Sequence, residues 1–162
     1  MTTNSTITAP DALARLEAES AINRLLASYV HSLDDGKFAE TAELLKHATL
    51  EVLGEFAETR EAIEQYLVNG VKRHGDVTPR TWHSVSNVLI DLDPSGEKAT
   101  SASYFTVHQE LDGFPLQPIC TGRYLDRFEK HDGEWRFAHR LVKARMLGDL
   151  RHHVAPVDRS RM

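Results

Sequence analysis

The chain has 162 residues, of which 41% are apolar and 27% are charged, and its formal net charge is −5. This size and composition are typical of one globular domain with a single core, and they argue against global disorder. The acidic balance without a stripe of Lys and Arg argues against a nucleic-acid partner, and no apolar run is long enough to cross a membrane.

The first part of the sequence predicts a long amphipathic helix. Residues 1–9 are rich in Thr, Ser and Asn, so we expect a flexible leader there, followed by a single domain over residues 10–150. From Asp11, apolar residues recur at spacings of three and four, which indicates one helix with one apolar face. Gly36 is the expected end of this helix, because glycine tolerates a left-handed backbone. The predicted apolar face consists of Leu13, Leu16, Ile22, Leu25, Leu26, Tyr29 and Leu33.

Three shorter elements are expected before the sequence changes character at Pro79. Residues 37–47 predict a short helix, residues 49–56 a strand, and residues 60–72 a third helix with apolar side chains on one side. These elements continue the helical half of the chain.

The second half predicts an antiparallel meander. Four strands are expected at about 80–92, 98–110, 117–130 and 134–147, and the connectors Asp93-Pro94-Ser95-Gly96, Asp112-Gly113 and Asp132-Gly133 are typical of tight turns. Helices followed by strands indicate an α+β fold with a curved, mainly antiparallel sheet. The chain from Gly148 onward is polar and basic, so we expect a flexible tail, with residues 151–162 outside the domain.

Several classes of functional site are absent from the sequence. It contains no glycine-rich phosphate loop, no nucleophile elbow and no Cys/His set with metal-ligand spacing, so no metal or organic cofactor is expected. The only cysteine, Cys120, cannot form an intramolecular disulfide and is typical of a small core residue. With no apolar signal-peptide core at the start, these features predict a cytoplasmic protein.

Acid–base chemistry needs a group that titrates near neutral pH and a second group that orients or charges it. His83 lies in an apolar strand, and Asp34 lies where the first helix is expected to end. Tyr29 lies on the apolar face of that helix, so its hydroxyl needs a partner inside the protein. Two structural interpretations compete: His31 could pair with Asp34 or Asp35 on the surface, and His83 could be a hydrogen-bonded structural histidine.

Five phrases of the sequence occur in an order typical of one family. They are Ala21-Ile22-Asn23-Arg24-Leu25-Leu26-Ala27-Ser28-Tyr29, Leu33-Asp34-Asp35-Gly36-Lys37-Phe38, Thr81-Trp82-His83-Ser84-Val85-Ser86-Asn87-Val88, Gly122-Arg123-Tyr124-Leu125-Asp126 and Asp132-Gly133-Glu134-Trp135-Arg136-Phe137. Over residues 15–150 the chain resembles the SnoaL-like branch of the nuclear transport factor 2-like superfamily. The resemblance implies a cone-shaped curved sheet, closed at one end by three helices from the N-terminal half that enclose a pocket.

The resemblance also implies a catalytic site. Scytalone dehydratase, bile acid 7α-dehydratase and hexachlorocyclohexane dehydrochlorinase pair a histidine of the first meander strand with an aspartate after the first helix, which match His83 and Asp34. A catalytic tyrosine five residues before the aspartate matches Tyr29. The sequence does not determine the register of the second meander strand. His108 is the nearest candidate for a third polar group in the pocket, but another register would place Tyr104 or Thr106 there. The further polar candidates for the pocket are His108, Tyr104, Thr106 and Asn87.

The function expected from these residues is that of a cofactor-independent dehydratase, lyase or isomerase acting on a small apolar or polycyclic molecule. The alternatives are a polyketide-type cyclase and a non-catalytic small-molecule-binding or assembly domain, because one fold serves many functions. We also expect a homo-oligomer, a dimer or trimer. The apolar residues of the final strands that could supply its interface are Tyr124, Phe128, Trp135 and Phe137.

Overall fold

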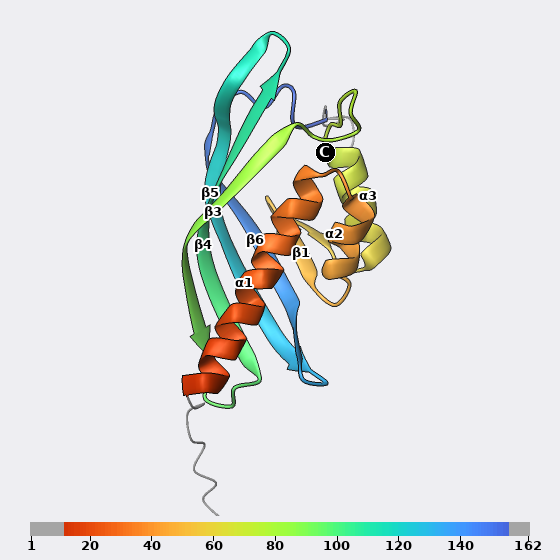
Figure 1. Ribbon diagram of the computed structural model, residues 1–162. Helices are drawn as coiled ribbons and strands as arrows, with labels where there is room; N and C mark the ends of the chain where they lie inside the picture. Colours follow the sequence, from red (N-terminus) through yellow and green to blue (C-terminus); the bar gives the residue numbers. More distant parts are fainter. Residues whose placement is uncertain (1–11, 156–162) are drawn as a thin grey trace, which may run out of the picture.

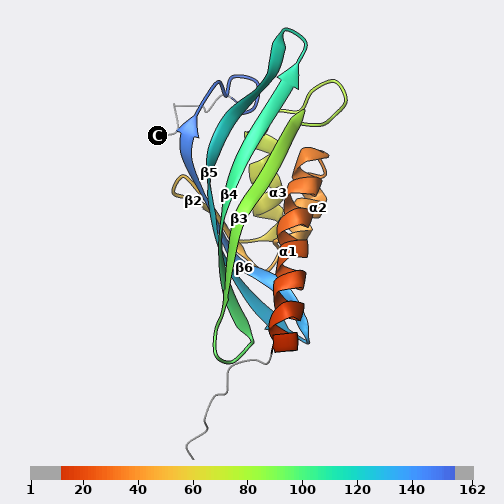
Figure 2. The ribbon, with the colours of Figure 1, turned by 60° about the vertical axis from the view of Figure 1, so that its left-hand side comes forward.

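The computed structural model describes residues 12–155. Three helices lie on one side of a curved sheet of six strands (Figure 1). Figure 2 shows the long first helix running alongside the sheet. The α+β architecture predicted from the sequence is therefore confirmed. Residues 1–11 and 156–162, which include the predicted leader and the last seven residues of the predicted tail, lie outside the described residues.

The first helix, α1 (Ala12–Asp34), carries the apolar face that packs on the sheet. Its buried residues are Ala18, Ile22, Leu26, Tyr29, Val30 and Leu33. Leu13 and Leu16, which the sequence pattern places on the same face, are 65% and 63% exposed. The prediction is wrong for these two side chains, because α1 is buried against the rest of the molecule only from Ala18 onward.

Gly36 ends α1 in the predicted left-handed conformation, with φ of +71°. The amide of Gly36 donates to the carbonyl of Leu33 (3.1 Å) and the amide of Lys37 to that of Ser32 (2.9 Å), which is the Schellman pattern. This turn directs the chain away immediately after Asp34, so that Asp34 is the last residue of the helix.

Gly36→Ala is expected to lower the free energy of unfolding by about 1–3 kcal/mol. A Cβ at this position would lie 2.6 Å from the carbonyl oxygen of Val77, and the left-handed backbone is unfavourable for alanine. Urea unfolding of the two proteins measures the difference. Gly54→Ala is the matched control, since Gly54 also has positive φ but its Cβ would meet no atom within 4 Å. Equal losses in the two variants would show that the contact with Val77 contributes nothing.

The middle of the chain contains α2 (Phe38–Leu44), β1 (Thr49–Val52), β2 (Glu55–Ala57) and α3 (Arg60–Gly70). The single strand predicted over residues 49–56 is in fact a hairpin, because Leu53 and Gly54 both adopt positive φ and turn the chain back. Strand β1 pairs in parallel with the last strand, and Thr49 lies opposite His139.

The second half forms the predicted meander of β3 (Thr81–Leu92), β4 (Lys98–Leu111), β5 (Phe114–His131) and β6 (Glu134–Leu147). The spatial order of the sheet is β2-β1-β6-β5-β4-β3, so β3 is an edge strand next to α1. No helix in residues 12–155 is long and apolar enough to cross a membrane.

The space between α1 and the sheet is occupied by large side chains, and at its centre lies a buried ion pair. Arg140 donates to both carboxylate oxygens of Asp126, from Nε at 2.9 Å and from Nη2 at 2.8 Å. Its guanidinium carbon lies 4.0 Å from the ring centre of Tyr29 and 4.2 Å from that of Tyr124. The side chains of Arg140 and Asp126 are completely inaccessible to solvent. The hydroxyl of Ser101 also donates to Asp126 Oδ2 (3.4 Å), and the ring centre of Phe137 lies 4.8 Å from the guanidinium carbon.

The aromatic residues expected at an oligomer interface mostly lie in this core. Tyr124, Phe128 and Phe137 are at most 2% exposed, and Trp135 is partly buried. The prediction that these residues supply an exposed interface is wrong for Tyr124, Phe128 and Phe137, whose side chains are buried in the core between the sheet and the helices. The large apolar side chains exposed on β3 to β6 are instead Trp82, Leu89, Tyr104, Leu116, Met146 and Leu147.

Residues 148–155, which we call the C-terminal segment, are packed on the domain. The amide of Lys72 donates to the carbonyl of His153 (2.8 Å), the amide of Ala155 donates to the carbonyl of Gly70 (3.0 Å), and Val154 forms an antiparallel bridge with Val71. The predicted flexible tail is therefore wrong for these residues. Their polar composition suggested mobility, but their backbone groups bond to the last residue of α3 and to the chain that follows it.

Candidate functional site

The end of α1 and the start of β3 bring Asp34 and His83 into contact. His83 Nδ1 lies 2.6 Å from Asp34 Oδ1, and the amide of His83 donates to Oδ2 at 2.8 Å. The hydroxyl of Thr81 also donates to Oδ1, at 2.7 Å. Thr81 and His83 are two residues apart on one strand, so their side chains share the face of the sheet that meets α1. Three hydrogen bonds therefore fix the carboxylate.

These contacts decide the charge and the tautomer of the pair. Burial alone would raise the pKa of Asp34, but the hydrogen bonds and charge of His83 and the hydrogen bond from Thr81 outweigh it and lower the pKa. The carboxylate is thus ionised and accepts the hydrogen on His83 Nδ1, which leaves Nε2 as the nitrogen that can take up a proton. The side chains of Asp34 and His83 are 17% and 5% exposed, respectively.

The surface pairing considered for His31 does not form. Asp34 is bound by His83, and Asp35 pairs with Lys37 at 3.0 Å. The alternative of a purely local ion pair at the end of α1 is therefore excluded for Asp34.

Tyr29 lies in the core, with its ring edge-on to Tyr124 and under the guanidinium of Arg140. No hydrogen bond joins it to Asp34 or His83 in the described part of the chain. Burial raises the pKa of Tyr29, although the charge of Arg140 opposes the effect. The phenol is therefore protonated at neutral pH.

The register of β4 places the other predicted pocket residues on the opposite side of the sheet. His83 pairs with Val107, whereas His108 pairs with the exposed Trp82. Alternation along the strand then directs Tyr104, Thr106 and His108 away from His83. Tyr104 is 46% exposed and accepts a hydrogen bond from Arg123 at 3.2 Å. The expectation that these side chains face the pocket is wrong.

Asn87 is exposed as well, at an irregularity of β3 where it adopts φ of +51°. The register between β3 and β4 shifts at this point. Asn87 therefore shapes the edge strand and does not join the group around His83.

Two residues that the sequence analysis missed lie near the pair. Gln109 on β4 is the cross-strand partner of Thr81 and is 1% exposed. Its Nε2 donates to the carbonyls of Pro79 (2.9 Å) and His152 (3.2 Å). The alternation of β4, once anchored on the apolar Val107, would have placed Gln109 on the inner face.

The other missed residue, His153, belongs to the C-terminal segment. Its Nδ1 is buried and has no hydrogen-bond partner among residues 12–155. Burial and the nearby charges of His83 and His74 lower the pKa of His153 to about 4, while Asp34 opposes the shift. This imidazole is therefore neutral at physiological pH. Nothing in the sequence indicated it, because the segment has no periodic pattern.

The stability of the fold is expected to fall as the pH drops from about 6.5 to about 4, in part through His153. In this window the unfolded chain binds a proton at His153 that the folded protein does not, so acid favours unfolding. Across this whole pH window, the protonation of His153 lowers the free energy of unfolding by about 3 kcal/mol. His153→Asn should have a flatter dependence than the wild type in urea unfolding at pH 7, 6, 5 and 4. Parallel curves for the two proteins would contradict the assignment.

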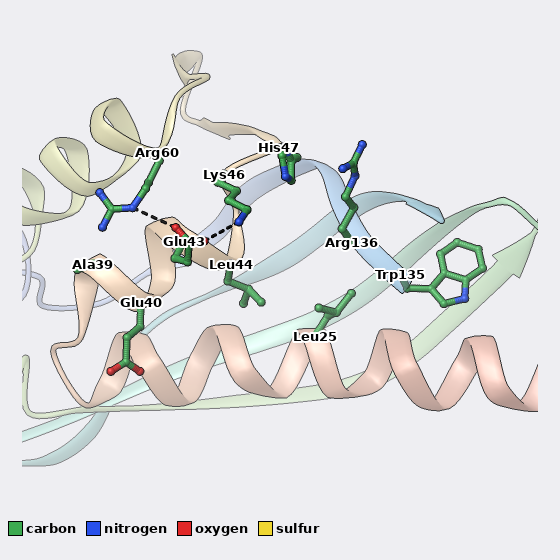
Figure 3. A pocket seen from close by; sticks show the side chains of 10 residues that line it. All are labelled: Leu25, Ala39, Glu40, Glu43, Leu44, Lys46, His47, Arg60, Trp135 and Arg136. Atoms are coloured by element: carbon green, nitrogen blue, oxygen red, sulfur yellow. Dashed lines mark hydrogen bonds and ion pairs between the residues drawn. The ribbon is translucent and has the colours of Figure 1, made fainter. Parts of the chain in front are cut away.

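Five hollows on the described surface lie away from the Asp34–His83 pair. One hollow, with a volume of about 600 Å³, lies between α1, α2 and the start of β6. Figure 3 shows the side chains that line it, among them the apolar Leu25, Leu44 and Trp135. On its rim, Glu43 accepts from Lys46 (2.6 Å) and Arg60 (3.2 Å). Neither Asp34 nor His83 lines this hollow or any of four others on the described surface. Within residues 12–155 no group of His, Cys, Asp or Glu side chains is arranged to hold a metal ion.

Comparisons with known proteins give a family match and fold neighbours. A model described as "SnoaL-like domain" matches residues 14–141. No curated protein sequence matches the chain. A variant of Rv3472 from Mycobacterium tuberculosis, described as a protein of unknown function, is 23% identical, with 85% of this chain and 78% of that chain covered and a TM-score of 0.69.

Two further solved structures are similar over nearly their whole length. A scytalone dehydratase candidate from Novosphingobium aromaticivorans DSM 12444 is 23% identical, with 92% of this chain and 99% of that chain covered and a TM-score of 0.68. LinA is 19% identical, with 89% of this chain and 97% of that chain covered and a TM-score of 0.68. At these identities the similarity establishes the fold.

Proposed function

The chain belongs to the SnoaL-like family, and from this premise we propose that it is an acid–base enzyme acting on a small, largely apolar organic molecule. The contact between His83 Nδ1 and Asp34 Oδ1 carries the proposal. A largely buried carboxylate that fixes one histidine tautomer is the arrangement that a general base requires.

In the proposed reaction, Nε2 of His83 removes a proton from a carbon next to an activating group. Asp34 then stabilises the imidazolium that forms, since its carboxylate stays ionised and hydrogen-bonded. The oxygen that gains electrons needs a hydrogen-bond donor or a proton. Tyr29 is the candidate for this role, because its raised pKa keeps the phenol protonated. Elimination, isomerisation and polyketide-type cyclisation can all begin with this proton transfer.

The similar structures give the proposal limited support. One of them is called a scytalone dehydratase candidate, which is consistent with an elimination reaction on this fold. Function depends on the site more than on the fold, so the argument relies on Asp34 and His83.

A non-catalytic binding or assembly domain is the second candidate function. The packing inside the molecule favours it, because Tyr29, Tyr124 and Arg140 occupy the space between α1 and the sheet. In that case the hydrogen bonds of Asp34 would serve only to attach the end of α1 to β3.

Proton exchange with solvent separates the two candidates. The protein would be incubated in D₂O with a panel of cyclic ketones, secondary alcohols and alkyl chlorides, and deuterium at the activated carbon would be followed by NMR. We expect enzyme-dependent exchange or elimination with at least one class. The control is His139→Ala. His139 is not part of the Asp34–His83 pair, and its Nε2 lies 3.1 Å from Glu51 Oε2, so its loss should change neither exchange nor elimination. Ligand-induced thermal stabilisation with no exchange and no elimination would favour the binding domain.

A further inference from the structure

Three cationic side chains lie together on the outer face of the sheet, the face that carries Tyr104. They are Arg123 on β5 and Lys143 and Arg145 on β6, and all three are exposed. Figure 1 shows the three helices on the other side of the sheet. Within residues 12–155, none of these cations forms an ion pair with a carboxylate. Arg123 and Lys143 are cross-strand partners, and like charges in such a pair are destabilising, so a bound anion would relieve the repulsion.

An irregularity of the sheet brings Arg145 to this face. The pairing between β5 and β6 shifts between Thr121 and Gly122, and Arg145 is left as an extra residue of β6 without a cross-strand partner. Such a bulge interrupts the alternation of side chains and changes the direction in which a side chain points. As a result, Arg145 lines the same two hollows as Arg123.

The two hollows have volumes of about 430 and about 350 Å³ and share both arginines. The larger one also contains three side chains with hydroxyl groups, those of Ser86, Thr106 and Thr121. These hydroxyls form no hydrogen bond with any described residue. Cations and hydroxyl donors without protein partners therefore converge on one hollow.

The side chain of Tyr104 holds Arg123 in position. Its hydroxyl accepts a hydrogen bond from Arg123 Nη2 (3.2 Å), and the guanidinium carbon lies 5.0 Å from the centre of its ring. A guanidinium has five N–H donors, so most of those of Arg123 remain available to a ligand. Because the side chain is already ordered, binding through it would lose little conformational entropy.

We propose that these residues form a binding site for a phosphate monoester, an organic phosphate attached to an apolar group. A phosphate monoester carries nearly two negative charges at neutral pH and three oxygens that accept hydrogen bonds. Arg123 and Arg145 can each bind it through parallel N–H donors, and Lys143 adds a third positive charge. The hydroxyl groups of the hollow can donate to the remaining lone pairs. A carboxylate has one charge and two oxygens, so it would use fewer of these groups.

The rest of the hollow fits the apolar part of such a molecule. Met146, which is 64% exposed, and the ring of Tyr104 line it beside the cations. Its volume is within the range of about 300–1,000 Å³ that is usual for small-molecule sites. A second copy of the chain is a poorer occupant, because a two-fold contact at this point would bring the same cations of both copies together.

The phosphate site does not depend on the proposed active site. His83 pairs with Val107, and alternation along β4 places the next residue, Thr106, on the opposite face of the sheet. The sheet therefore separates the two sites. His83→Gln should bind a phosphate monoester with an unchanged Kd, and loss of binding in this variant would show that the ligand binds at the inner face instead.

Calorimetric titration of the full chain with phenyl phosphate at constant ionic strength tests the site. We expect one molecule to bind per chain, and Arg145→Gln to raise the Kd at least about tenfold, because it removes a charge-assisted hydrogen bond. The matched control is Arg127→Gln. Arg127 is an exposed residue of β5 that lies about 13 Å along the strand from Arg123 and lines neither hollow. Its replacement should change the Kd less than about twofold, since a charge at that distance is largely screened.

Thermal unfolding provides a second measurement that does not require the Arg145 variant to fold. Lys143→Gln removes one member of the like-charged pair, so without ligand its Tm should equal or exceed that of the wild type. Phenyl phosphate should raise the Tm of the wild type by more than that of Lys143→Gln. Equal increases in the two proteins would show that Lys143 does not contact the ligand and would contradict the site as proposed.

The choice of ligands separates a phosphate site from a general attraction of anions. The inference is overturned if neither phenyl phosphate nor inorganic phosphate binds, or if benzoate binds as tightly as phenyl phosphate. It is also overturned if Arg127→Gln weakens binding as much as Arg145→Gln does. Binding of an oligoglutamate peptide in place of phenyl phosphate would assign this surface to an acidic protein partner instead.

Discussion

Asp126→Leu is expected to lower the free energy of unfolding by about 3–5 kcal/mol, because it leaves the guanidinium of Arg140 buried without its counter-ion. Both side chains are inaccessible to solvent, and two hydrogen bonds of 2.8 and 2.9 Å join them. The flanking rings of Tyr29 and Tyr124 stabilise a cation but cannot replace a carboxylate. Urea unfolding followed by circular dichroism measures the loss.

The double variant Asp126→Leu/Arg140→Met is the control for this experiment. Replacing a buried ion pair with apolar side chains of similar volume is often nearly neutral, so the double variant should recover most of the stability that Asp126→Leu loses. A double variant as unstable as the single one would show that packing, and not the unpaired charge, causes the loss.

His83→Ala is expected to reduce turnover by roughly 10²–10⁴-fold, the usual contribution of one acid–base group. Asp34→Asn should cause a loss of similar order, because an amide cannot stabilise the imidazolium and can hold the ring in the wrong tautomer. Steady-state rates with the best substrate from the exchange panel measure both effects.

The unfolding free energies of the same variants separate chemistry from structure. His83→Gln keeps a polar side chain near Asp34 but cannot act as a base, so it should be folded and still inactive. His139→Ala should retain the wild-type rate, because the pair that it disrupts lies away from Asp34. Full activity in a folded His83→Ala protein would remove His83 from the mechanism.

Much of the fold could be predicted from local patterns. The apolar periodicity of α1, the glycine that ends it and the turns between the meander strands are all encoded within a few residues, and they predicted the correct α+β class. The family was predicted from the resemblance of five sequence phrases. The hairpin at Leu53 and Gly54 was missed because a leucine with positive φ is unusual. The order of strands across the sheet, with β1 beside β6, depends on contacts between distant residues.

The site was less predictable than the fold. The Asp34–His83 pair was suggested by a family resemblance, since spacing alone did not distinguish it from a local pairing with His31. The facing of His108 depends on the register between β3 and β4, which a shift in pairing near Asn87 influences. Backbone hydrogen bonds of the C-terminal segment hold His153 near the site. Any residue type except proline can form such bonds, so the sequence does not reveal them.

The parallel pairing of β1 with β6 has a consequence for synthesis of the protein. This part of the sheet can form only after His139 has been synthesised, because His139 pairs with Thr49. At ordinary rates of translation, about 5–20 seconds pass between the synthesis of these two residues. During that time the apolar face of α1 has emerged from the ribosome without most of the strands that cover it. The domain therefore completes its fold late in translation, and the apolar face of α1 stays largely uncovered until the strands of the second half have been synthesised.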